Sequence, residues 1–199
     1  ITSANTRLSI ILNGGVTVRM NSGQEIRIGD GSDLSITGLN QGVSSDIATN
    51  SSADPDNGAT IFGDDDSDLF HIISSSATTR FRIENVNVIH TYAGSDDAKG
   101  MITATDSSGS SKGIWIRIKG CLLKQTLADT ALINWTNIPS AAVLEVCDSV
   151  IRYKKEGFFD STIGTHPANH ILFMYITNNT FMEGGTSSLA GSYGHFNLN

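Results

Sequence analysis

The stretch MYITNNTF, residues 174–181, begins with the alternating apolar side chains of a β-strand and then places two asparagines before an apolar residue returns. Asparagine is a poor strand former, but it tolerates the left-handed backbone conformation and can hydrogen-bond nearby backbone groups. Asn178 and Asn179 therefore indicate a sharp corner between two strands rather than the interior of one strand.

The same five-residue pattern recurs along the chain: an apolar residue, any residue, a second apolar residue, any residue, and then Asn, Gly or Asp. Its copies are Leu34–Gly38, Phe81–Asn85, Ile116–Gly120, Leu144–Asp148 and Met174–Asn178. The central apolar residues (Ile36, Ile83, Ile118, Val146 and Ile176) are separated by steps of 47, 35, 28 and 30 residues. Three residues after the corner the later copies are apolar again, whereas the first copy has Gln41 there and is the weakest match. A constant motif with variable spacing predicts loop insertions between fixed corners.

Further apolar segments lie between these motifs, at 101–102, 131–133 and 158–159, and weakly at Leu189. Helical periodicity is hard to find, so each repeat supplies more than one strand. Such repeats suit a parallel β-helix, because each coil buries its apolar side only by stacking on its neighbours. The sequence therefore predicts an all-β parallel β-helix, a solenoid with about 28–35 residues per motif repeat and loop insertions.

Three stretches resemble coils of the right-handed parallel β-helices of the pectin-lyase-like superfamily. They are FRIENVNVIH (81–90), GATIFGDDDSDLFHI (58–72) and MYITNNTF (174–181). The resemblance covers roughly residues 8–198 and implies a right-handed solenoid. The superfamily includes pectate lyases, glycoside hydrolases, phage tailspikes and adhesins, so the resemblance does not select an activity.

An antiparallel β-sandwich is the alternative fold, because it also has short strands separated by turns. Sandwich strands are commonly joined by two-residue Asn-Gly or Asp-Gly hairpins. Asp30-Gly31 is the only clear candidate of that type in this sequence. The scarcity of hairpin signals favours the β-helix.

The chain has 199 residues, a formal net charge of −7 and a pI of about 5.0. Nucleic-acid binding needs a basic surface, so this balance argues against nucleic acid as a partner. No apolar run approaches the roughly 18 residues of a membrane-spanning helix. The length predicts one β-helix domain over residues 1–199, and the start at Ile1 suggests a processed form or fragment of a larger chain.

The two cysteines are predicted to be free thiols. Cys121 and Cys147 are expected in neighbouring coils, but their positions in the strand register differ by two residues. This offset separates their Cα atoms by roughly 8 Å. That distance is beyond comfortable disulfide reach, and two cysteines are too few for a disulfide scaffold.

A surface for carbohydrate is predicted beside the corner strands. Outward positions on two neighbouring coils carry Arg80, Arg82, Arg117 and Lys119, which would stack into a basic patch at the strand spacing of about 4.8 Å. Trp115 and Tyr153 could stack on sugar rings if exposed, and Trp115 alternates with an inward isoleucine. The predicted ligand-binding residues are Arg82, Arg117, Lys119 and Trp115. Ordinary solvated surface charge is the alternative, because Glu145 and Tyr175 continue the Arg117 column.

Calcium is a predicted ligand of the acidic loops, because this hard cation takes about six to eight oxygen ligands. The candidate ligands are Asp54, Asp56, Asp64, Asp66 and Asp68. The match to a calcium loop is partial, since the distal Glu of an EF-hand is missing, and a plain acidic loop is the alternative. Catalytic carboxylates in this run are disfavoured, because catalytic pairs come from different strands and one member needs desolvation.

The sequence favours a secreted or cell-surface β-helix domain that engages a polysaccharide or cell-surface glycan by binding. One alternative is a polysaccharide lyase or glycoside hydrolase, although the necessary acid, base and ion constellation is incomplete. Another is a structural subunit that stacks end to end in an extracellular filament, because no amphipathic helix caps the predicted coils.

Overall fold

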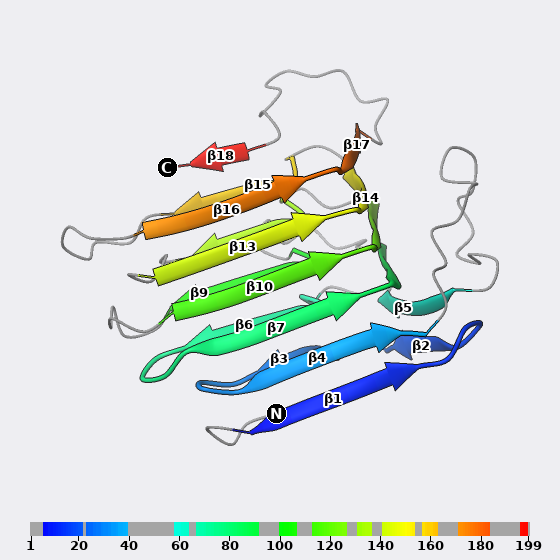
Figure 1. Ribbon diagram of the computed structural model, residues 1–199, viewed down its shortest axis with the longest axis horizontal. Helices are drawn as coiled ribbons and strands as arrows, with labels where there is room; N and C mark the ends of the chain where they lie inside the picture. The colour runs from blue at the N-terminus through cyan, green and yellow to red at the C-terminus, as the bar shows by residue number, and fades with distance from the viewer. Residues whose placement is uncertain are drawn as a thin grey trace.

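Three sheets form the walls of a solenoid, and each coil contributes one strand to each sheet (Figure 1). The computed structural model describes residues 6–21, 23–39, 58–63, 67–91, 100–106, 113–126, 131–136, 141–153, 157–162, 171–183 and 196–198. Sheet A consists of β1 (Arg7–Leu12), β4 (Asp33–Gly38), β7 (Thr79–Glu84), β10 (Gly113–Lys119), β13 (Ala141–Cys147) and β16 (Ile171–Thr177). Sheet B consists of β2 (Thr17–Met20), β5 (Ala59–Gly63), β8 (Val86–Thr91), β11 (Leu122–Thr126), β14 (Val150–Tyr153) and β17 (Thr180–Glu183). Sheet C consists of β3 (Ile26–Ile28), β6 (Phe70–Ser74), β9 (Ile102–Asp106), β12 (Ile133–Thr136), β15 (Phe159–Thr162) and β18 (Phe196–Leu198).

All pairings between the described strands are parallel, and each strand pairs with its counterpart in the next coil. This arrangement confirms the predicted parallel β-helix, and the alternative of an antiparallel sandwich is wrong. The described residues contain no helix, and hence none that is long and apolar enough to cross a membrane.

Apolar columns fill the inside of the solenoid along its axis. In sheet A one column contains Leu34, Phe81, Ile116, Leu144 and Met174, and the next contains Ile36, Ile83, Ile118, Val146 and Ile176. In sheet B the apolar residues that follow the corners, Val88, Leu123, Ile151 and Phe181, are also level with one another. The ring centroids of Phe70 and Phe81 are 4.8 Å apart, which joins sheet C to sheet A across the core. The repeated motif thus buries each coil against the next, as predicted.

The corner between sheets A and B has the backbone conformation that the motif predicts. Asn85, Gly120, Asp148 and Asn178 all have positive φ angles, of 56°, 60°, 52° and 53°. Glycine occupies this corner in one coil, and a Cβ at Gly120 would lie 2.5 Å from Oδ1 of Asn85, so the Asn85 side chain would have to move to accept it. The first copy differs: Gly38 is not left-handed, and its glycine is needed because a Cβ would collide with the carbonyl oxygen of Asn85.

The second asparagine of the NN pair bonds to the preceding coil. Oδ1 of Asn179 accepts a hydrogen bond from the Ser149 amide at 2.9 Å, and its Nδ2 donates to the Val146 carbonyl at 2.7 Å. Beside it, Nδ2 of Asn178 donates to Oδ1 of Asp148 at 2.7 Å. One asparagine therefore takes the left-handed turn, and both join one coil to its neighbour.

Asp30 holds a second corner, between sheets C and A. Its carboxylate accepts hydrogen bonds from the amides of Ser75, Ser76 and Ala77 in the next coil and from the Ser76 hydroxyl. Burial pushes the pKa of Asp30 upward, but the hydrogen bonds from the Ser76 hydroxyl and the three amides outweigh it and hold this pKa well below its usual range. The ionised carboxylate therefore stabilises the stacked turns.

Both cysteines are buried free thiols, as predicted. Burial raises the pKa of Cys121 to about 12. Burial also raises the pKa of Cys147, and the charges of Asp148 and Glu145 add to that shift. Neither side chain is a thiolate at neutral pH, so the two cysteines act as small core residues.

Candidate functional site

Side chains on the outer face of sheet A form columns that cross the strands. One column contains Arg80, Trp115, Val143 and Phe173, and the next contains Ser35, Arg82, Arg117, Glu145 and Tyr175. The predicted continuation of the Arg117 column by Glu145 and Tyr175 is confirmed. Adjacent strands are about 4.8 Å apart, so neighbouring side chains of a column can contact one another.

The columns border a hollow of about 410 Å³, which we call the sheet A groove. It is lined by Ser35, Arg80, Phe81, Arg82, Glu84, Trp115, Ile116, Arg117, Val143 and Glu145. Three of the predicted ligand-binding residues, Arg82, Arg117 and Trp115, are thus brought together. Lys119 is exposed farther along β10, level with Glu84, and is not one of the lining residues.

Carboxylates accompany the arginines of the groove. Nη2 of Arg82 lies 2.8 Å from Oδ2 of Asp33. Nε of Arg117 lies 3.7 Å from Glu84 Oε1 and 3.5 Å from Glu145 Oε1, and within the described part of the chain it has no hydrogen-bond partner. The surface therefore has mixed charge, in contrast to the basic patch predicted from Arg80, Arg82, Arg117 and Lys119.

Aromatic rings stand on the same face as the arginines. Trp115, Phe173 and Tyr175 are 49%, 49% and 55% exposed. The guanidinium carbon of Arg80 lies 5.6 Å from the centre of the Trp115 ring, in a cation–π contact. Tyr153, the other aromatic considered for sugar stacking, is 4% exposed and belongs to the core. The exposed rings therefore extend two strand spacings from Trp115, about 9.6 Å, across β13 to β16.

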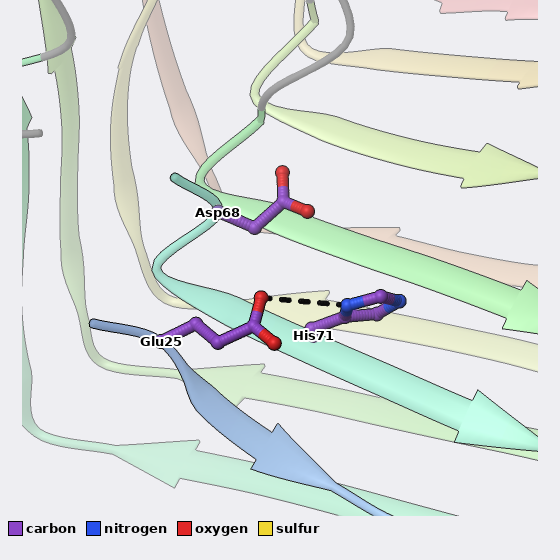
Figure 2. A group of neighbouring side chains, drawn as sticks. All are labelled: Glu25, Asp68 and His71. Carbon is purple, nitrogen blue, oxygen red and sulfur yellow. Dashed lines mark ion pairs between the residues drawn. The ribbon is translucent and has the colours of Figure 1, made fainter. Parts of the chain in front are cut away.

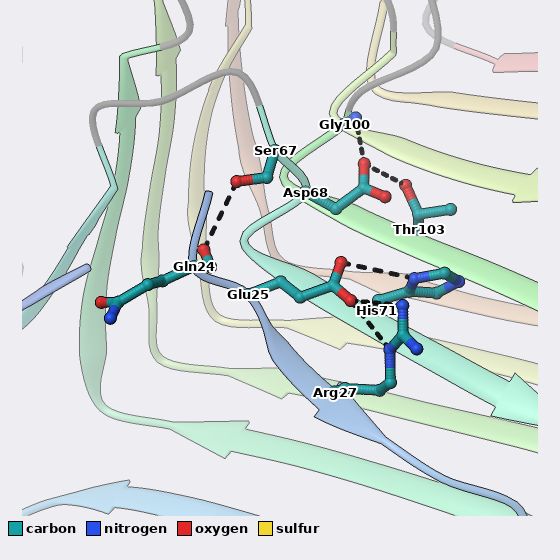
Figure 3. A network of polar contacts seen from close by, with 8 residues as sticks. All are labelled: Gln24, Glu25, Arg27, Ser67, Asp68, His71, Gly100 and Thr103. Atoms are coloured by element: carbon teal, nitrogen blue, oxygen red, sulfur yellow. Dashed lines mark hydrogen bonds and ion pairs between the residues drawn. The ribbon is translucent and has the colours of Figure 1, made fainter. Parts of the chain in front are cut away.

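The one predicted calcium ligand that the structure describes is buried and hydrogen-bonded. Asp54, Asp56, Asp64 and Asp66 lie outside the described residues. Asp68 precedes β6, and its Oδ1 accepts hydrogen bonds from the Gly100 amide at 2.9 Å and the Thr103 hydroxyl at 2.7 Å (Figure 3). Its neighbours therefore hold this carboxylate in one orientation.

Glu25 and His71 lie beside Asp68 on the side of the solenoid formed by sheet C (Figure 2). One potential ligand atom from each of the three side chains lies within 4.8 Å of the others. Oε2 of Glu25 is 3.5 Å from Nδ1 of His71, while Oε1 accepts a hydrogen bond of 2.8 Å from Nε of Arg27. No short sequence motif marks this cluster. Glu25 directly precedes β3 and Asp68 precedes β6, and the β3–β6 register places Ile26 level with Phe70, which brings the two strand ends together.

A scan of protein-family models found no match to this chain, and searches of curated proteins and of solved structures returned no significant match. The sheet A groove combines an exposed ring with ion-paired side chains on a hydrogen-bonded sheet, where ligand contacts can be held in place. Its geometry is therefore the basis for the proposed function.

Proposed function

We propose that this chain is a secreted or cell-surface β-helix domain of the pectin-lyase-like type that binds carbohydrate in the sheet A groove. The observation that supports it is the exposed Trp115 ring beside Arg80, Arg82 and Arg117 in one hollow of about 410 Å³. The apolar face of a sugar ring can stack on an indole, while guanidinium and carboxylate groups hydrogen-bond its hydroxyls. A binding site needs this combination of an apolar surface and oriented polar groups.

The charge balance of the groove indicates the class of glycan. Its arginines are accompanied by Glu84 and Glu145 within the lining and by Asp33 beside it. These carboxylates would repel a densely anionic polymer lying in the groove. The proposed ligand is therefore a neutral glycan, or one with isolated acidic groups that Arg117 can bind.

The row of rings indicates how the glycan lies. Val143 separates Trp115 from Phe173 along one column, and Tyr175 is the outward residue two positions after Phe173. A sugar chain that stacks on these rings crosses the strands and follows the axis of the solenoid. Successive coils then contact successive sugar units.

Polysaccharide cleavage is the second candidate function, because two carboxylates flank Arg117 in the groove. Glycoside hydrolases use such pairs, with separations of about 5–10 Å, and keep one member protonated in an apolar pocket. Glu84 and Glu145 are instead ion-paired with the same guanidinium. Binding is therefore the function that the groove supports better.

A glycan array followed by calorimetric titration of the best ligand tests the proposal. Trp115→Ala and Arg117→Ala should each weaken binding about tenfold, which corresponds to roughly 1.4 kcal/mol. Lys119→Ala is the matched control, because it removes an exposed cation from the same strand outside the groove lining. This control should change the affinity by less than about twofold, or roughly 0.4 kcal/mol.

Two results would contradict carbohydrate binding in the groove. The first is that no polysaccharide or oligosaccharide binds, and the second is that both groove variants bind as the native chain does. Incubating the same glycans with the native chain separates the two candidate functions. Release of unsaturated or reducing products, abolished by Glu145→Gln, would favour cleavage over binding.

A further inference from the structure

We propose that Glu25, Asp68 and His71 form a binding site for a divalent transition-metal ion, with Zn²⁺ as the ion that best fits the three side chains. The site lies on sheet C and is independent of the proposed function of the sheet A groove. It also differs from the predicted calcium site, with which it shares only Asp68.

One pair of donor atoms already has the separation expected of a metal-bound set, and all three donor atoms lie near one another. Zinc bound at about 2.0–2.1 Å in tetrahedral geometry keeps its ligand atoms about 3.3–3.4 Å apart. Oε2 of Glu25 and Nδ1 of His71 are already 3.5 Å apart, and no pair in the cluster exceeds 4.8 Å. Side-chain rotations that close the longest pair by at most about 1.5 Å would complete the site.

Outer hydrogen bonds hold two of the three ligands. The Gly100 amide and the Thr103 hydroxyl, both from the next coil, bind Oδ1 of Asp68 (Figure 3). Arg27 approaches Oε1 of Glu25 at 2.6 Å through Nη2 and at 2.8 Å through Nε. Because Arg27 contacts Oε1, the other oxygen, Oε2, faces His71 (Figure 2). Partners of this kind orient the ligands of protein metal sites.

The types of donor select the ion. Calcium and magnesium take oxygen ligands, whereas imidazole suits zinc and other first-row transition metals. Two carboxylates supply the negative charge that a divalent cation offsets. Glu25 and His71 have side chains that are 23% and 22% exposed, so an ion can enter from solvent. Three protein ligands leave a fourth position of the tetrahedron for water.

Titration calorimetry of the full chain without a histidine tag tests this site, using ZnCl₂, MnCl₂ and CaCl₂ in separate runs. One Zn²⁺ should bind per chain, more tightly than Ca²⁺. Glu25→Gln and His71→Asn should each lower the Zn²⁺ affinity about 100-fold, since each removes one of three donors. Thr103→Val should lower it about 10- to 100-fold, because it removes one of the hydrogen bonds that orient the Asp68 carboxylate.

Asp148→Asn is the matched control, because it removes an exposed carboxylate at a corner where asparagine also occurs, and Zn²⁺ affinity should not change. Glu25→Gln and His71→Asn decide the outcome, because Asp68→Asn would also disturb a buried hydrogen-bonded residue. Circular dichroism would verify that both variants fold. The proposal would be overturned if the native chain bound no Zn²⁺, if both variants bound Zn²⁺ as tightly as the native chain, or if Ca²⁺ bound more tightly than Zn²⁺. Glu25, Arg27 and His71 would then form an ion-pair network only.

Discussion

The inner and outer faces of sheet A share one strand register but differ in the types of residue that occupy equivalent positions. On the inner face, the column through Ile83 contains only isoleucine and valine from β4 to β16. On the outer face, the neighbouring column changes from Ser35 to arginine, glutamate and Tyr175 over the same strands. The inner face must fill a closed space, whereas the outer face has only to remain compatible with a strand.

This contrast assigns different roles to alternate residues of the same strand. Inward residues specify the fold, because they are buried against the coils above and below. Outward residues are free to carry a binding site, because the backbone ladder already fixes their spacing. Substitutions on the two faces should therefore separate stability from binding.

The largest effect is expected from Phe81→Ala on the inner face. Phe81 is fully buried and packs against Phe70, so the truncation should lower the free energy of unfolding by about 3–5 kcal/mol. Urea denaturation followed by circular dichroism measures this loss. Phe81→Leu, which keeps most of the volume, should cost less than about 1.5 kcal/mol. A loss below about 1 kcal/mol for Phe81→Ala would mean that the inner column does not control the fold.

The next largest effect is expected at the corner that ends the sheet A strands. Gly120→Ala adds a Cβ where φ is 60° and Oδ1 of Asn85 would be 2.5 Å away. It should lower the free energy of unfolding by about 2 kcal/mol, since a left-handed alanine alone costs roughly 1–2 kcal/mol. The same denaturation experiment measures it.

Asn178→Gly is the control for the corner. It keeps the left-handed backbone and loses the hydrogen bond to Asp148, so its cost should stay near 1 kcal/mol or below. If Gly120→Ala is no more destabilising than this control, the close contact with Asn85 does not constrain the corner.

A smaller, pH-dependent effect is expected at Asp30, where the chain enters sheet A. Asp30→Asn should lower the free energy of unfolding by about 1–2 kcal/mol at pH 7, because a charged acceptor of several hydrogen bonds is lost. The pKa of Asp30 is lower in the folded chain than in the unfolded chain, so acid protonates the unfolded chain first. The stabilisation is therefore present at neutral pH and is lost progressively below about pH 4.

Denaturation of the native chain and Asp30→Asn at pH 7 and pH 3 measures this dependence. The difference in unfolding free energy between them should be smaller at pH 3. A difference that stays constant with pH would show that the charge of Asp30 does not stabilise the corner.

The smallest effect on stability is expected from Trp115→Ala on the outer face. The ring is 49% exposed and contacts Arg80, so its removal should cost only about 0.5–1 kcal/mol in unfolding free energy. Thermal and urea denaturation both measure this change. A loss as large as that of Phe81→Ala would break the distinction between the two faces.

The fold could be predicted from sequence because its determinants are local and repeated. The alternation that ends at Asn178 recurs at Asn85, Gly120 and Asp148, and each recurrence marks the same corner. Stacking then determines which residues are level with one another. Gly38 is the exception. It fits the sequence pattern but lacks the left-handed backbone conformation of the other corners. Glycine occurs there because the Asn85 carbonyl leaves no room for a Cβ.

The candidate sites could be predicted only in part. Register brought Arg82, Arg117 and Trp115 together as expected, because columns follow from the strand motif. The contribution of Glu84 was missed: its side chain reaches Arg117 from the neighbouring column, and side-chain reach is not encoded in strand alternation. Phe173 was also missed, although its alternation with inward residues marked it as exposed.

The cluster on sheet C lay beyond sequence reasoning for a different reason. Glu25 and Asp68 precede their strands, and their positions depend on how two corners stack. No periodic pattern in the sequence indicates how these corners stack.

The left-handed corner makes the coil a unit that can be exchanged as a whole. Residues 86–120 extend from just after one such corner to the next, so excision of that segment joins Asn85 directly to Cys121 and preserves the alternation on both sides. β7 would then pair with β13, with Phe81 level with Leu144 inside and Arg82 level with Glu145 outside. The core would stay apolar, while the groove would lose the Trp115 indole and Arg117, and Arg82 would replace Arg117 as the arginine level with Glu145. Loss or duplication of a whole coil can therefore change the side chains on the outer face of sheet A in a single step, while the inner apolar columns stay continuous.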